Sequence, residues 1–251
     1  AMVEAIAEGA VPFSCQGTDT PGTIDGCRTL AWEIVDALSD TDDGRPRLDR
    51  LFVQVGGGAL ATAVLTGFAA SPALDRLPVV HAVQPRGNHP LVRAWDRLVA
   101  ELIEAEQPTG NPDRAEAAAA VGKMGDDQAR RIVRRLAASG DRYMAPWDDE
   151  PESYATGILD DVTYDWIPIV EAMLRTGGHP VIAEEPDLRR AHALARTRTD
   201  IEVCPTGAAG LGGLVAALGD GSVTPAAGER IVVMFTGHSR AGDPVPAGAP
   251  S

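Results

Sequence analysis

The sequence has little of several residue types on which whole classes of protein depend. Its 251 residues include one lysine, Lys123, three cysteines and 4% aromatic residues. Cys15, Cys27 and Cys204 are too widely spaced to predict a disulfide framework or a zinc site, and they favour the reducing cytoplasm. No apolar run approaches the ~20 residues that span a bilayer, which argues against a membrane-spanning protein.

Basic residues are scarce relative to acidic ones. The chain carries 22 Lys and Arg against 36 Asp and Glu, a formal net charge of −14. Duplex nucleic acids and anionic membrane surfaces both bind basic faces, so we expect no nucleic-acid partner and no membrane partner. With 44% hydrophobic and 23% charged residues, the composition is that of a globular protein, and the chain is long enough to bury a core.

Short apolar segments alternate with amphipathic ones along the chain. We expect strands at 11–15, 51–55, 79–83, 180–184, 201–203 and 231–235. We expect helices at 2–9, 29–38, 59–70, 90–105, 115–121, 127–138, 163–175, 185–198 and 208–218, and loops at 16–26 and 148–154. The alternation predicts an α/β fold with an open, mainly parallel twisted sheet flanked by helices. Residues 1–240 are expected to form one domain and 241–251 a flexible tail.

The strongest local feature is Gly56-Gly57-Gly58, between an expected strand and an expected helix. Glycines lack a Cβ atom, so they let the backbone turn sharply and approach a ligand. The N–H groups of such a loop, together with the positive end of the following helix, favour an anion. Ligands of parallel α/β sheets bind at this end of the strands. The loop therefore predicts a phosphate site, and the alternative is a tight turn whose glycines serve only packing.

Other site types are less well supported. The spacing Gly56-x-Gly58-x-x-Ala61 fits a dinucleotide fingerprint, but the next expected strand ends in Gln84-Pro85-Arg86, without the acidic residue that binds the ribose. The five histidines show no paired-ligand spacing, so we expect no metal site. Thr206 is expected to cap the helix that follows it.

Four segments, at 23–34, 53–61, 204–211 and 231–238, lie in the same order as, and resemble, stretches of the fold-type II pyridoxal-phosphate enzymes of the tryptophan synthase β-chain superfamily, threonine synthases in particular. The run Val-Gln-Val-Gly-Gly-Gly-Ala-Leu-Ala at 53–61 resembles the phosphate loop of that family. Residues 23–34 are similar to the Glu-Gly-x-Lys-Thr stretch of threonine synthases, 204–211 to the family's Pro-x-Gly-Ala helix start, and 231–238 to its last strand with a Thr-Gly-His end. The motif Asp160-Asp161-x-x-Tyr164-Asp165-Trp166 is similar to a stretch of the threonine-synthase-like subgroup.

The resemblance implies pyridoxal 5′-phosphate as cofactor, an amino acid as substrate, and β- or γ-elimination or replacement as the reaction, as in threonine synthase and serine/threonine dehydratase. The implied phosphate ligands are Gly56, Gly57, Gly58, Ala59 and Leu60, and the implied partner of the pyridine nitrogen is Thr236. A neutral hydroxyl does not keep that nitrogen protonated, so the ring withdraws electrons weakly, which suits elimination better than transamination. The family also implies a homo-oligomer.

The sequence departs from the family at the lysine that forms a Schiff base with the cofactor. In the family that lysine precedes the glycine loop, and here no lysine precedes Gly56. Lys123 follows the loop between two expected helices, the setting of an ordinary exposed lysine. We therefore expect a chain that opens Ala1-Met2 to be the C-terminal portion of a longer enzyme and inactive alone. The alternative is a non-catalytic α/β module that binds a phosphorylated ligand or nucleotide through the loop Gly56–Gly58.

This interpretation predicts that the chain forms no stable covalent bond with pyridoxal 5′-phosphate. After incubation with the cofactor and reduction with borohydride, peptide mapping should find no specifically labelled lysine. Specific labelling of Lys123 would overturn the interpretation.

Overall fold

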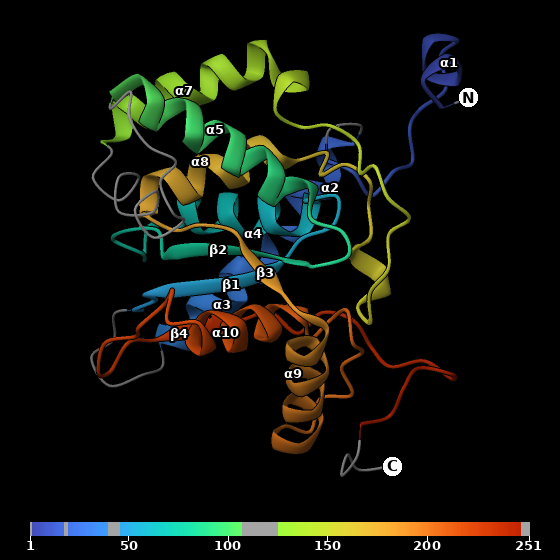
Figure 1. The fold of residues 1–251 in the computed structure, drawn as a ribbon, viewed down its shortest axis with the longest axis vertical. Coiled ribbons are helices and arrows are strands. Elements are labelled where there is room, and N and C mark those ends of the chain that lie inside the picture. Colours follow the sequence, from blue (N-terminus) through green and yellow to red (C-terminus); the bar gives the residue numbers. More distant parts are fainter. Residues whose placement is uncertain (1, 18–19, 40–45, 107–124, 247–251) are drawn as a thin grey trace.

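The computed structural model describes residues 2–17, 20–39, 46–106 and 125–246. Their centre is a four-stranded sheet in the order β3-β2-β1-β4, in which every pairing is parallel (Figure 1). The strands are β1 (Arg50–Gln54), β2 (Val79–Pro85), β3 (Val181–Ala183) and β4 (Ile231–Val233). The predicted α/β fold with a mainly parallel sheet is confirmed.

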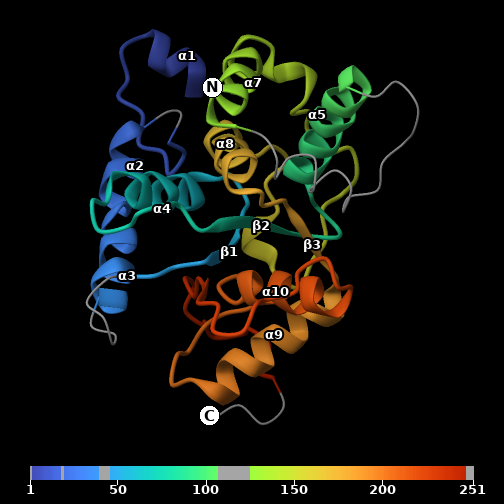
Figure 2. The ribbon, with the colours of Figure 1, turned by 90° about the vertical axis from the view of Figure 1, so that its left-hand side faces the viewer.

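Helices cover both faces of this sheet. The described helices are α1 (Met2–Ala7), α2 (Pro21–Cys27), α3 (Thr29–Ser39), α4 (Ala59–Ala70), α5 (Pro90–Glu106), α7 (Asp126–Ala138), α8 (Trp166–Thr176), α9 (Glu185–Arg198) and α10 (Ala209–Gly219), with short 3₁₀ turns at Gly140–Arg142 and Thr156–Ile158. Figures 1 and 2 show α4, α5, α7 and α8 on one side of the sheet and α10, backed by α9, on the other. In the part of the chain that the structure describes, no helix combines the length and apolarity needed to cross a membrane.

The central strand β1 is buried on both faces. Leu51 and Val53 lie in a core cluster with residues of α4, α5, α7 and α8, whereas Phe52 belongs to a second cluster beside α10. All three side chains have an exposed fraction of 0%. Burial on both faces is typical of parallel strands and explains the uninterrupted apolar run that the sequence shows here.

Helix α10 approaches the sheet closely because its inner face carries glycines. A Cβ atom on Gly213 would overlap the Val83 side chain, and one on Gly210 would lie 3.1 Å from the Phe52 carbonyl oxygen and 2.8 Å from Gln54 Oε1. These two glycines therefore allow α10 to pack closely against the sheet.

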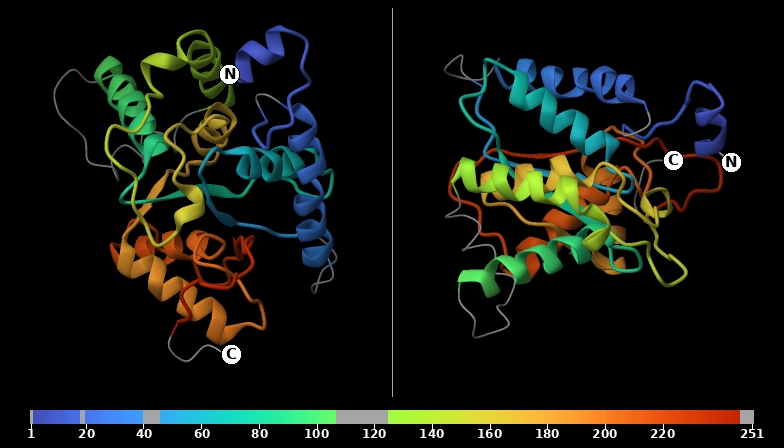
Figure 3. Two further views of the ribbon diagram at one scale, coloured as in Figure 1. Left: turned by 90° about the vertical axis from the view of Figure 1, so that its right-hand side faces the viewer. Right: turned by 90° about the horizontal axis from the view of Figure 1, so that it is seen from above.

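The structure differs from the expected elements at the N-terminal end. Residues 11–15 form no strand, and Val11 and Phe13 are 90% and 106% exposed, because no neighbouring strand pairs with them. The expected loop at 16–26 contains α2 instead, which begins at Pro21, a residue well suited to a first helical turn. Figures 1 and 3 both place α1 at the margin of the fold, away from the sheet.

The elements expected at 201–203 and 115–121 are not among the strands and helices that the structure describes. Residues 201–203 form no strand, since only Val203 pairs, in one antiparallel bridge with His238. The helix expected at 115–121, Lys123 and the last residues of the expected tail, 247–251, lie outside the described residues. The remaining expected strands and helices are present, with ends shifted by a few residues at most.

His81, in β2, is a buried and neutral histidine. Its ring stacks on Phe52, with 4.6 Å between the centroids, and its exposed fraction is 1%. Its Nδ1 lies 3.0 Å from the His179 carbonyl oxygen and its Nε2 lies 2.8 Å from Arg50 Nη1. Because the carbonyl only accepts and the guanidinium only donates, Nδ1 carries the proton. Burial, with the nearby charges of His179 and Arg50, lowers the pKa of His81 to about 3.

The lowered pKa of His81 predicts a pH-dependent free energy of unfolding. Below about pH 6.5 the unfolded chain binds a proton at His81, whereas the folded chain excludes it down to about pH 3. The contribution of His81 to the free energy of unfolding is therefore fully present above pH 6.5. It is lost as the pH drops from 6.5 towards 3, by up to about 1.4 kcal/mol per pH unit.

Urea unfolding over this pH range should reveal the slope as a difference between the wild type and His81→Gln. Glutamine can replace both hydrogen bonds but does not titrate, and all carboxylates are shared by the two proteins. Parallel stability curves would contradict the prediction.

Candidate functional site

The glycine loop lies where the sequence places it, between the end of β1 and the start of α4. β1 is flanked by β2 on one side and β4 on the other, and both run parallel to it. The carboxyl ends of these strands therefore meet at one edge of the sheet. Thr236 follows β4 at this edge, so the two predicted parts of the site, 180 positions apart in sequence, are brought together.

The three glycines lie close to neighbouring groups, and Gly58 is the one that its backbone conformation also requires. Gly58 has φ +99°, and an added Cβ atom would lie 3.2 Å from atoms of Thr163, Asp165 and Ile169. A Cβ atom on Gly56 would overlap the Asp160 carboxylate, and one on Gly57 would overlap the Gln16 side-chain amide. Gly58 therefore excludes a side chain, whereas at Gly57 the overlap is with the movable end of Gln16.

The segment that covers the loop is the motif ending in Asp165-Trp166. The Asp165 N–H donates to the Gly57 carbonyl oxygen over 2.9 Å, and the Thr62 hydroxyl donates to the Asp165 carbonyl oxygen over 3.0 Å. The Asp165 carboxylate accepts the Gly17 N–H over 2.8 Å. Asp165 thus joins the glycine loop, α4 and the N-terminal segment, a structural role that its position in the sequence motif did not specify.

A carboxylate already faces the N–H groups of the loop. The Gly57 N–H donates to Asp160, whose half-buried side chain stands against Gly56. Burial raises the pKa of Asp160, the negative charge of Asp161 adds to this, and the Gly57 hydrogen bond partly opposes it. The loop thus donates one backbone hydrogen bond to an acidic side chain.

The first turn of α4 presents further donors at the same place. Ala59 and Leu60 begin the helix, Gly58 is its N-cap residue, and no side chain caps it. N–H groups in a first turn have no partner within the helix, and the positive end of the helix dipole adds to their attraction for an anion. Gly56, Gly57, Gly58, Ala59 and Leu60, the predicted phosphate ligands, therefore lie on one continuous stretch of backbone at the start of α4.

Thr236 is held by Gln54, a residue that the sequence did not single out. Gln54 Nε2 lies 2.7 Å from Thr236 Oγ1 and 3.2 Å from the Gly207 carbonyl oxygen. Gln54 is 4% exposed, and its Oε1 atom is buried without a hydrogen-bond partner. Such an unpaired group costs about 1–3 kcal/mol, so its retention requires a reason.

Thr206 and His238 lie close in the sequence to Gly207 and Thr236. Thr206 does not cap α10, since its hydroxyl accepts the Gly157 N–H over 2.9 Å and the N-cap residue is Ala208. The expectation was wrong because α10 begins at Ala209, too far along the chain for Thr206 to be its N-cap residue. His238 is exposed and its Nε2 lies 3.5 Å from Glu202 Oε2.

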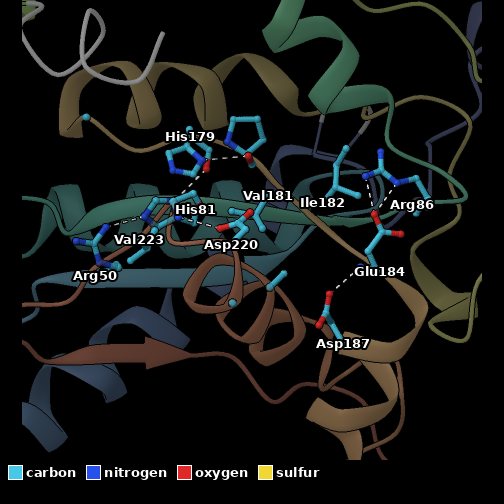
Figure 4. A pocket seen from close by; sticks show the side chains of 15 residues that line it. Arg50, His81, Arg86, His179, Val181, Ile182, Glu184, Asp187, Asp220 and Val223 are labelled. Carbon is cyan, nitrogen blue, oxygen red and sulfur yellow. Dashed lines mark hydrogen bonds and ion pairs between the residues drawn. The ribbon is translucent and has the colours of Figure 1, made fainter. Parts of the chain in front are cut away.

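A separate cavity of ≈ 600 Å³ lies beside β3 (Figure 4). Its basic side chains already have partners, since Arg86 pairs with Glu184 at 2.6 Å and Arg50 pairs with Glu229 at 2.7 Å. None of the six residues predicted to bind the cofactor lines it. The candidate site is therefore the glycine loop and Thr236.

The chain is similar to known enzymes over most of its length. Residues 1–150 match the family described as pyridoxal-phosphate dependent enzyme. The chain is 24% identical over 240 residues to threonine synthase of Methanocaldococcus jannaschii, a match that covers 94% of this chain and 47% of that protein. The chain thus spans about half the length of this curated relative.

Solved structures show the same fold. The threonine deaminase of T.th. is 20% identical, with a TM-score of 0.57 and coverage of 90% of this chain and 61% of that one. The processed form of threonine deaminase isoform 2 from Solanum lycopersicum is 16% identical, with a TM-score of 0.58 and coverage of 96% and 52%.

The geometry of Gly58 predicts that its substitution destabilises the chain. Gly58→Ala meets both a positive φ and three close neighbours, whereas Gly221→Ala meets a positive φ of +76° in open space. Gly221→Ala should lower the free energy of unfolding by about 1 kcal/mol, and Gly58→Ala should lower it by about 1–3 kcal/mol more. Urea unfolding of both variants tests this, and equal losses would show that the loop is not tightly packed.

Proposed function

The chain belongs to the pyridoxal-phosphate dependent enzymes, and from that premise we propose that its glycine loop holds the cofactor phosphate in an enzyme that eliminates or replaces a β- or γ-substituent of an amino acid. The observation that carries the proposal is the loop Gly56–Gly58 at the carboxyl end of β1, running into α4 beside Thr236. The similarity to a threonine synthase supports this class of reaction.

The residues present fit the phosphate group. Side chains are absent from the loop, which leaves the backbone N–H groups of Gly57, Gly58, Ala59 and Leu60 to donate. These donors lie at the positive end of a 12-residue helix. A dianionic phosphate is stabilised by both effects, and the glycines allow it to approach the backbone closely.

Thr236 fits the other end of the cofactor. Bound pyridoxal phosphate supplies an aromatic ring that withdraws electrons from the substrate. We propose that the Thr236 hydroxyl hydrogen-bonds the ring nitrogen. A carboxylate at this position would hold a proton on that nitrogen, whereas a hydroxyl does not, and the weaker withdrawal favours elimination and replacement.

Asp160 is the residue that phosphate has to displace. Its carboxylate accepts the Gly57 N–H, and two anions do not share that donor without strong repulsion. We propose that the Asp160 side chain leaves the loop, or takes up a proton, when phosphate binds. Its raised pKa favours the second route more than an ordinary aspartate would.

The proposal also covers the domain, the substrate, the assembly and the location. We propose that residues 1–240 act as the cofactor domain, that the substrate is an amino acid, and that the enzyme works as a homo-oligomer in the cytoplasm. The similarity to threonine synthase and the threonine deaminase fold supports an amino-acid substrate. The lysine of the reaction is not assigned to any residue that the structure describes.

Calorimetric titration with pyridoxine 5′-phosphate, which lacks the aldehyde, tests the phosphate site. Asp160→Asn should bind this ligand about tenfold more tightly than the wild type, because it removes a negative charge from the loop. Asp161→Asn is the matched control, since it makes the same change of charge at an exposed neighbour that does not touch the loop.

Two results would count against this proposal. Equal effects of the two variants would show that Asp160 does not compete with phosphate. If the wild type bound pyridoxine 5′-phosphate no more tightly than inorganic phosphate, the loop would be a general phosphate site, and the non-catalytic module would be the better description.

A further inference from the structure

We propose that Gln54 is a positioning residue that directs the proton of the Thr236 hydroxyl toward the ligand, so that the site selects the uncharged form of the cofactor's ring nitrogen. The proposal rests on the proposed function, since it concerns the same contact of Thr236. It adds a residue from β1 and a direction of hydrogen bonding to that contact.

The orientation of the Gln54 amide is fixed by the Gly207 carbonyl. That oxygen can only accept, so the amide nitrogen, not the amide oxygen, must face it at 3.2 Å. The same nitrogen lies 2.7 Å from Thr236 Oγ1. One hydrogen of the amide serves each contact, and Thr236 therefore receives a hydrogen bond from Gln54.

The direction of this hydrogen bond determines which kind of partner the Thr236 hydroxyl can bind. A hydroxyl oxygen that accepts from Gln54 still carries its own proton, and among the described residues no acceptor for that proton is found. Thr236 is exposed, so its hydroxyl is accessible to a ligand at the loop edge. A hydroxyl that accepts one hydrogen bond also donates more strongly in another. That proton is best used by an acceptor, which a neutral pyridine nitrogen is, whereas a pyridinium could take only the second lone pair of the oxygen and would leave the proton to solvent.

The unpaired oxygen of Gln54 is consistent with an amide whose nitrogen faces Thr236. Gln54 Oε1 is buried against α10, next to Gly210, and has no hydrogen-bond partner. Reversing the amide would turn the oxygen toward the Gly207 carbonyl and Thr236, and two carbonyl oxygens would then face each other. The described structure keeps the nitrogen toward Thr236 and leaves the oxygen unsatisfied.

The charged groups near this contact do not supply an alternative proton acceptor. His238, two residues further on, is 74% exposed and pairs with Glu202. Asp160 stands at the glycine loop, where it faces Gly56 and Gly57. On the α10 side, Cys204 accepts the Gly207 N–H through its sulfur atom. Among the described residues, the hydrogen bond of Gln54 is thus the contact that orients the Thr236 hydroxyl.

The test uses the full chain and pyridoxine 5′-phosphate labelled with ¹⁵N in the ring. The ¹⁵N chemical shift reports directly whether the bound nitrogen is protonated. In the wild type the nitrogen should be neutral at pH 7. In Gln54→Met, which fills the same space without a donor, its titration midpoint should rise by about one pH unit, a tenfold change in the protonation equilibrium.

A double-mutant comparison separates positioning from packing. Thr236→Val removes the hydroxyl, so adding Gln54→Met to that background should leave the ¹⁵N titration unchanged, whereas the urea midpoint reports any loss of packing. Equal shifts with and without Thr236 would overturn the proposal.

The ¹⁵N spectrum of the wild type alone can also contradict the role proposed for Gln54. A bound ligand whose ring nitrogen is protonated at pH 7 would overturn the role of Gln54 while leaving the phosphate site intact. A ligand that does not bind at all would overturn the proposed function itself. These two failures are distinguishable because binding is measured first, by calorimetry.

Discussion

The parallel pairing of β1 with strands on both sides is the constraint on which the rest of the molecule depends. β1 pairs with β2 over five residues and with β4 over three, all in one direction. Three carboxyl ends consequently meet at one edge, and no backbone of β1 is left free to shift. The glycine loop, the end of β2 and Thr236 take their positions from this single arrangement.

Two buried glutamines on neighbouring strands illustrate how the polar groups at this edge differ. Gln84 satisfies its whole amide, since Nε2 donates to the Val55 carbonyl oxygen and the Thr163 hydroxyl while Oε1 accepts the N–H groups of Leu91 and Val92. Its role is to join β1 to the start of α5. Gln54 leaves one atom unpaired. The contrast separates an amide that stabilises the fold from one that orients a neighbour.

The sequence predicts those parts of the fold that depend on local pattern. The apolar run of β1, the three glycines and the helix α4 are adjacent in the chain, so periodicity and backbone chemistry locate them. The strand at 11–15 was wrong because a short apolar run specifies no partner, and strand formation depends on one. The roles of Gln54 and Asp160 were missed for a related reason, although both residues lie in motifs that resemble those of the family. Their roles come from contacts with Thr236 and Gly57, and nothing in the neighbouring sequence marks such long-range contacts.

The long sequence separation of these contacts has a consequence for folding. Gln54 and Thr236 are 182 residues apart, and Gly17 and Asp165 are 148 apart. Contacts of such range close large loops, so they form late and their loss accompanies unfolding of most of the chain. A molecule bound at the loop edge contacts segments that are far apart in the sequence, so its binding stabilises the native state of the whole chain rather than that of one helix or strand.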